Sequence, residues 1–159
     1  MNLSTLDQAI RIFVAIIVGS IIGLERMKFH KAAGVRTHAI ITVICTMLTI
    51  VSAYGFAGLP GSTDPSRLIA NILTGVGFLA GGVIYVTTKK DANHVEEGVV
   101  GLTTAAGIFG AAMLGIPIGV GHFQLVILTV AGIELSLKSE YIMKKLHILK
   151  EDDEHHELE

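Results

Sequence analysis

The chain has 159 residues and a formal net charge of −2, and 51% of its residues are hydrophobic. Charged residues make up only 16%, whereas soluble domains contain roughly 25%. Three stretches contain no Asp, Glu, Lys or Arg: residues 37–63, 68–88 and 98–133. Each is long enough to cross about 30 Å of hydrocarbon as a helix. The composition therefore excludes an ordinary soluble enzyme and predicts an integral membrane protein.

The first half of the chain predicts three membrane spans. The first covers residues 6–24 and follows a capping sequence formed by Ser4 and Asp7. Basic residues follow this apolar segment rather than precede it, which argues against a cleaved signal peptide. The second and third spans are predicted at residues 37–59 and 65–87.

The long uncharged stretch at residues 98–133 predicts two further spans, because it is too long for one helix. Pro117 lacks the backbone N–H that a continuous helix needs, and glycines lie on both sides of it. We therefore expect a break there, with spans at residues 99–114 and 118–137. The predicted fold is an all-α membrane bundle of about five helices.

The basic residues predict how the bundle is oriented. With five spans, ten of the 12 Lys and Arg residues fall on one side of the membrane, and only Arg11 and Arg67 fall on the other. Because cytoplasmic loops carry an excess of Lys and Arg, the amino terminus is expected outside and the carboxyl terminus in the cytoplasm. Residues 1–141 are predicted to form the membrane domain, and residues 142–159 an interfacial segment with an acidic cytoplasmic tail.

Small and polar residues recur on one face of several predicted spans. Such faces allow helices to pack closely or to form oligomers, and the alternative is a solute pathway lined by threonines. Except for His122, ionisable side chains lie outside the middle of the spans, which counts against a coupled transporter. In the second span the face consists of His38, Thr42, Cys45, Thr46, Thr49 and Ser52. In the third span it consists of Arg67, Asn71, Thr74, Gly75, Phe78 and Gly82. Possible dimer contacts are Gly19 with Gly23, or Gly107, Ala111 and Gly115.

Acidic residues near the ends of the spans are candidates for ion pairs. Asp64 is expected to cap the third helix, with the following proline at the first helical position. Arg67 would then enter the edge of the membrane, where it needs a carboxylate partner, either Asp64 or Asp7. If such a pair is buried, removal of one partner is expected to be costly.

Three acidic residues are candidate ligands for a magnesium ion. Mg²⁺ prefers one or two carboxylates and retains several waters, and the candidate ligands are Asp64, Glu25 and Glu134. Glu134 is also placed to pair with Lys138 one helical turn away. The sequence has no nucleophile elbow and no nucleotide-binding loop, so we expect no enzymatic activity, and no nucleic-acid binding is indicated.

Five short motifs occur in order between Arg11 and Leu137. They are Gly19-x-x-x-Gly23-x-Glu25-Arg26, Gly34-x-Arg36-Thr37-His38, Asp64-Pro65-Ser66-Arg67, Gly75-x-Gly77-Phe78-Leu79 and Gly101-Leu102-Thr103-Thr104-Ala105-Ala106. Together they resemble the MgtC/SapB family of bacterial inner-membrane proteins. The chain resembles the short members that lack a soluble carboxy-terminal domain.

This resemblance implies a multi-pass inner-membrane protein linked to magnesium homeostasis and, in pathogens, to survival inside host cells. It further implies a regulator that acts through other membrane proteins, with the ATP synthase as one possible partner, and no enzymatic cofactor. A channel or carrier for Mg²⁺ is the alternative function. The candidate functional polar residues are Glu25, Arg26, Arg36, Thr37, His38, Asp64, Arg67, Asn71, Thr103 and Thr104. The candidate helix-packing residues are Gly19, Gly23, Gly75, Gly77 and Gly107.

Overall fold

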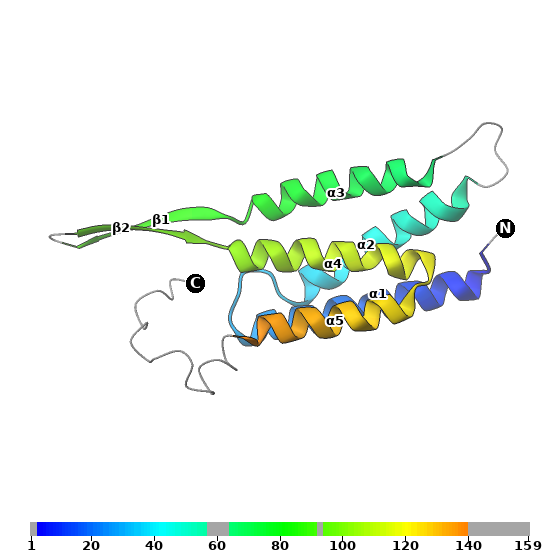
Figure 1. Ribbon diagram of the computed structural model, residues 1–159, viewed down its shortest axis with the longest axis horizontal. Coiled ribbons are helices and arrows are strands. Elements are labelled where there is room, and N and C mark those ends of the chain that lie inside the picture. Colours follow the sequence, from blue (N-terminus) through cyan, green and yellow to red (C-terminus); the bar gives the residue numbers. More distant parts are fainter. Residues whose placement is uncertain (1–2, 57–63, 92–93, 140–159) are drawn as a thin grey trace.

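The computed structural model describes residues 3–56, 64–91 and 94–139. In this part of the chain, five α-helices lie side by side and alternate in direction, and a β-hairpin projects from one end of the bundle (Figure 1). The elements are α1 (Thr5–Lys28), α2 (Val35–Ile50), the π-helical segment η1 (Val51–Gly55), α3 (Pro65–Gly81), β1 (Tyr85–Asp91), β2 (His94–Val100), α4 (Leu102–Val120) and α5 (Phe123–Leu137).

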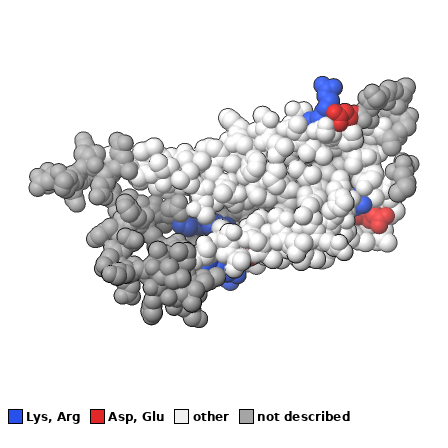
Figure 2. Space-filling view, in the orientation of Figure 1, with Lys and Arg blue, Asp and Glu red and all other residues white. Residues whose placement is uncertain are grey.

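The bundle has two distinct ends. We call them the hairpin end, from which β1 and β2 project, and the N-terminal end, where α1 begins (Figure 1). The connection between α1 and α2 and the end of α5 also lie at the hairpin end. Charged side chains are found near the two ends, whereas the middle of the bundle is uncharged on the visible face (Figure 2). This distribution is typical of a membrane protein.

Three helical segments are long and apolar enough to cross a membrane: residues 5–28, 35–55 and 102–120. The helix α5 is apolar but shorter, with 15 residues, and α3 has 17 residues. The predicted helical nature of all five segments is therefore confirmed. The predicted boundary between residues 1–141 and 142–159 lies outside the described residues.

Both predicted helix caps are confirmed. The Ser4 hydroxyl accepts a hydrogen bond from the backbone N–H of Asp7 at 3.1 Å and donates one to the Asp7 carboxylate at 2.6 Å. At the start of α3, a carboxylate oxygen of Asp64 accepts from the backbone N–H of Ser66 at 2.9 Å, and Pro65 occupies the first helical position. These side chains satisfy N–H groups that have no partner within the helix.

The third predicted span, residues 65–87, is too long, and the fold is not all-α. The helix α3 ends at Gly81, and the chain then forms an antiparallel hairpin whose register pairs Tyr85 with Val100 and Asp91 with His94. The physical reason is composition, since β-branched residues are frequent in both strands and favour extended backbone. The sequence prediction treated these residues as the end of a helix and a loop.

The predicted break at Pro117 is also wrong. The helix α4 continues through Pro117 to Val120, so the proline lies in the last helical turn, where little helix follows it. The helix ends instead at Gly121, whose φ of +91° is easily adopted only by glycine. The backbone N–H groups of Gly121 and His122 both donate to the Pro117 carbonyl, at 3.0 and 2.8 Å.

The helix α2 lies between α1 and α4, and glycines make both contacts close. On α1, a Cβ atom added at Gly23 would lie 2.4 Å from the Val35 Cα atom. On α4, a Cβ atom added at Gly115 would lie 2.7 Å from the Cys45 Cβ atom. Both distances are shorter than atoms tolerate, so the packing of α2 requires glycine on its two neighbours.

This packing predicts different effects for two glycine substitutions. Gly115→Ala should lower the free energy of unfolding by about 1–3 kcal/mol, because its methyl group overpacks the contact with α2. Gly132→Ala on α5 is the matched control, since no atom lies within 4 Å of the added methyl group. Loss of helical circular dichroism on heating in detergent measures both. Equal melting temperatures for the two variants would contradict the close-packing argument.

A buried polar stripe and two charged ends as the candidate functional site

A continuous row of polar side chains follows one side of α2 and η1. We call it the α2 polar stripe, and it consists of His38, Thr42, Thr46, Thr49 and Ser52. Each of these residues is at most 4% exposed. The prediction that they share one helical face is confirmed, and that face lies inside the bundle rather than on its surface.

Most hydroxyl groups of the stripe donate to backbone carbonyl groups. Thr42 Oγ1 lies 2.9 Å from the His38 carbonyl oxygen and 3.1 Å from the carbonyl oxygen of Ala111 on α4. Ser52 Oγ donates to the carbonyl oxygen of Pro65 at 2.6 Å and thereby links η1 to α3. The stripe therefore joins neighbouring helices, as expected where polar groups pack away from water.

Two polar atoms of the stripe have no hydrogen-bond partner among the described residues. The Nδ1 atom of His38 is 2.9 Å from the Gly34 carbonyl oxygen, which occupies one side of the ring. The Nε2 atom on the other side is buried and unpaired, as is Thr46 Oγ1. A Cβ atom added at Gly107 would lie 3.2 Å from Nε2. The imidazole therefore fits against α4 because residue 107 is glycine.

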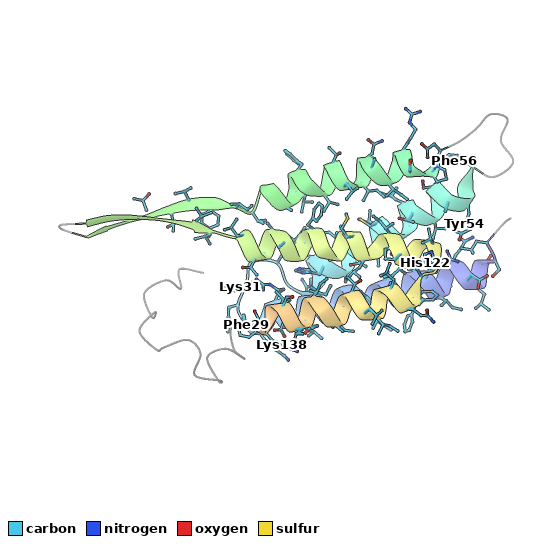
Figure 3. The ribbon with its side chains drawn as sticks, in the orientation of Figure 1. Phe29, Lys31, Tyr54, Phe56, His122 and Lys138 are labelled. Atoms are coloured by element: carbon cyan, nitrogen blue, oxygen red, sulfur yellow. The ribbon has the colours of Figure 1, made fainter. Side chains whose placement is uncertain are left out.

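Charged residues are buried at the hairpin end. Glu25 and Arg26 on α1 are only 5% and 4% exposed, and Glu25 Oε1 has no hydrogen-bond partner in the described part of the chain. On α5, Lys138 Nζ lies 3.1 Å from Glu134 Oε2, which confirms that predicted pair. Lys31 and Lys138 are labelled at this end in Figure 3. Buried charge is costly unless it is compensated. The burial of Glu25 and Arg26 therefore makes the hairpin end part of the candidate functional site.

At the N-terminal end, Arg11 connects three elements. Its guanidinium donates to the carbonyl oxygen of Gly119 near the end of α4 and to the Tyr54 hydroxyl at 3.3 Å. It also lies over the Tyr54 ring, 5.2 Å from the ring centre, in a cation–π contact. Tyr54 is labelled at this end in Figure 3. Sequence reasoning missed this contact because it joins residues 108 positions apart.

Asp64 and Arg67 do not form the predicted buried pair. Both side chains are exposed, and Arg67 forms no ion pair with the described residues. Asp64 Oδ1 instead accepts hydrogen bonds from the backbone N–H and the hydroxyl of Ser66. These two bonds are the main reason that the pKa of Asp64 is lowered, and Arg67 contributes a smaller electrostatic effect. The expected cost of breaking a buried pair therefore does not apply here.

The remaining candidates are distributed over several surfaces. Arg36, Asn71 and Thr103 are exposed, Thr37 is half-buried, and Thr104 is 3% exposed. The proposed magnesium ligands do not meet, because Asp64 lies at the N-terminal end whereas Glu25 and Glu134 belong to the hairpin end. The described residues contain no group of three or more His, Cys, Asp or Glu side chains that could hold a metal ion.

The lowered pKa of Asp64 predicts a pH dependence at the start of α3. A lowered pKa means that folding favours the ionised carboxylate, so its stabilising effect is present above the ordinary aspartate pKa. That effect is lost as the pH falls through the lowered value. Hydrogen exchange at the Ser66 amide, corrected for the intrinsic rate, should therefore increase on acidification. Asp64→Asn keeps a capping oxygen without the charge, and an unchanged pH response in this variant would refute the assignment.

Comparisons with known proteins show which family the chain resembles. The family model described as the MgtC family matches residues 12–147. YhiD of Escherichia coli (strain K12), named as a proposed magnesium transporter, is 40% identical over 76% of this chain and 54% of its own length. SapB of Bacillus subtilis (strain 168) is 39% identical over 74% of this chain and 50% of its own length.

A more distant relative is MgtC of Brucella abortus (strain 2308), which is 34% identical over 67% of this chain and 40% of its own length. The chain thus spans about half the length of the curated relatives it matches. No solved structure matches it. The family match covers most of the chain, including the whole of α2, α3, α4 and α5 and all of α1 after its first seven residues. The chain belongs to the MgtC family.

Proposed function

We propose that this chain is a multi-pass protein of the bacterial inner membrane that contributes to magnesium homeostasis by regulating other membrane proteins through contact. The link to magnesium is supported by family membership and by the name of the relative YhiD. We include no enzymatic activity in this proposal, since the sequence has no nucleophile elbow and no nucleotide-binding loop.

The observation that carries the regulatory role is the closed packing of the α2 polar stripe. A water-filled path needs polar groups that face a cavity. The hydroxyls of Thr42, Thr49 and Ser52 instead donate to backbone carbonyls, and each of these side chains is at most 4% exposed. Glycines of α1 and α4 bring the neighbouring backbones against the same helix. This arrangement favours a rigid bundle that presents its ends to partners.

The distribution of basic residues supports an orientation for this bundle. Arg26, Lys28, Lys31 and Arg36 flank the connection between α1 and α2, and Lys138 follows α5 at the same end. Arg11 in the second turn of α1 and Arg67 in the first turn of α3 belong to the other end. By the positive-inside rule, the hairpin end faces the cytoplasm and the amino terminus lies outside.

A Mg²⁺ channel or carrier is the second candidate function. One observation favours it: a groove of about 410 Å³ at the N-terminal end is lined by Asp64, Arg67 and Asn71 together with Ser52 and Phe56. A carboxylate and an amide oxygen are ligands that Mg²⁺ accepts. The groove includes Ser52 of the α2 polar stripe, but that hydroxyl already donates to the Pro65 carbonyl, and the rest of the stripe does not line it, which is why we rank this function second.

The orientation predicts which engineered cysteines are reached from outside the cell. In a Cys45→Ala background, which removes the single native cysteine, a membrane-impermeant maleimide should label Thr5→Cys in intact cells. Thr88→Cys in the hairpin should be labelled only after permeabilisation. Both positions are exposed, so they form a matched pair. The reverse labelling pattern would overturn the orientation.

The regulatory role predicts a growth effect without ion conduction. In a host strain without its own homologue, the chain should improve growth at limiting magnesium, whereas purified protein in dye-loaded liposomes should give no Mg²⁺ flux above empty liposomes. Protein-dependent flux that is lost in Asp64→Asn would establish the second candidate instead. An absence of any growth effect would remove the link to magnesium.

A further inference from the structure

The glycines of α1 and α4 that suggested a dimer contact pack against α2 inside the bundle. Added Cβ atoms at Gly19 and Gly23 would meet the backbone of α2, and the same is true at Gly115. Ala111 is fully buried. These residues are therefore unavailable to a second chain. The helix α3 is different, because an added Cβ atom at Gly75, Gly77 or Gly81 has no atom within 4 Å.

The outward side of α3 is unusual for a surface that faces lipid. Only Ile72 and Ala80 of this helix are buried, and Phe78 on the opposite side is 88% exposed. A lipid-facing helix surface is normally apolar, since lipid cannot satisfy polar groups. The outward side of α3, which we call the α3 face, nevertheless carries charged, amide and hydroxyl side chains. It consists of Asp64, Arg67, Asn71, Thr74, Gly75 and Phe78, all exposed.

Asn71 is the most informative residue of the α3 face. It follows the first residue of α3 by six positions, or about 9 Å along the helix axis, which places its amide within the apolar part of the bundle. The side chain is exposed and forms no hydrogen bond with the described residues. An amide left in hydrocarbon without a partner is costly. A partner that supplies both a donor and an acceptor would remove that cost.

We propose that the α3 face binds a second copy of this chain, with the two α3 helices parallel and related by a two-fold axis along the membrane normal. In such a dimer, residue i of one copy contacts residue j of the other and the reverse, and a residue beside the axis meets its own counterpart. An amide both donates and accepts, so Asn71 can pair with Asn71 of a second copy. Asp64 and Arg67 carry opposite charges one helical turn apart. Asp64 of one copy can therefore face Arg67 of the second copy, and Arg67 of the first can face Asp64 of the second.

The shape of the α3 face is self-complementary as well. An apolar groove of about 360 Å³ separates α3 from α2 and is lined by Ile41, Ile44, Leu48, Leu68 and Leu79. Asn71 and Gly75 of the α3 face line the same groove, and the exposed Phe78 follows Gly75 on that face by three positions, or about one helical turn. A two-fold axis places the ring of each copy beside the groove of the other. Protrusion and groove on one surface favour a second copy over an unrelated partner.

Cysteine crosslinking in native membranes tests this dimer. In the Cys45→Ala background, Thr74→Cys lies on the α3 face, and Leu128→Cys on α5 is a matched control because that side chain is 72% exposed to the same lipid. At low expression and with mild oxidation, the Thr74→Cys protein should form a disulfide-linked dimer and the Leu128→Cys protein should remain monomeric. Monomeric Thr74→Cys, or equal crosslinking of both variants, would overturn the proposal.

A second variant separates a specific contact from random collision. Asn71→Leu should make the Thr74→Cys dimer about threefold to tenfold weaker, the effect of losing one or two membrane hydrogen bonds. Thr103→Leu replaces an exposed polar residue of α4 and should leave the dimer unchanged. If Asn71→Leu leaves crosslinking unchanged, the amide makes no contact with a second copy and the proposal fails. These readouts require no magnesium-dependent activity, so they are independent of the proposed function.

Discussion

The close contact of α2 with α1 and α4 requires glycine on both neighbours, and the other features of the bundle depend on it. Substitution at Gly23 or Gly115 would force the helices apart, because the added atom would meet the α2 chain itself. At this separation a threonine on α2 can reach a carbonyl on the neighbouring helix, as Thr42 reaches Ala111. Lipid provides no hydrophobic driving force between helices, so such contacts and van der Waals packing hold the bundle together.

This packing divides the polar residues into two groups with different roles. Those on α2 are buried inside the bundle, where the hydroxyl groups of Thr42, Thr49 and Ser52 donate to backbone carbonyl groups. Those at the N-terminal end, Asp64 and Arg67, are exposed, so partners or ions can approach them. In a transporter, the α2 residues would have to contact the solute inside the bundle. In a regulator, the residues near the ends would have to contact a partner protein. The burial of the α2 residues is therefore the structural basis on which the regulatory role is preferred.

The sequence predicted the helices and both caps because these depend on local patterns of charge and hydrophobicity. It placed the end of α4 incorrectly because proline was weighted above Gly121, although glycine just after a helix is itself a strong stop signal. The hairpin was missed because its β-branched residues were read as the end of a span. The contact of Arg11 with Gly119 could not be predicted, since nothing near either residue in the sequence indicates which helices become neighbours. The exposure of Asp64 and Arg67 could not be predicted either, because it depends on which side of α3 packs against the other helices.

The Arg11 contact also constrains the order of assembly. The two residues that it joins are separated by 108 positions, and at 5–20 residues per second the second emerges roughly 5–20 s after the first. During this interval the guanidinium of α1 lacks the α4 carbonyl, although Tyr54, which is 43 positions away, emerges earlier. The guanidinium must be solvated by water at the membrane surface, so α1 enters the bilayer before its final partner exists. When α4 arrives, its Gly119 carbonyl accepts the hydrogen bond from Arg11. The helix α4 therefore fixes the position of α1, which entered the membrane first.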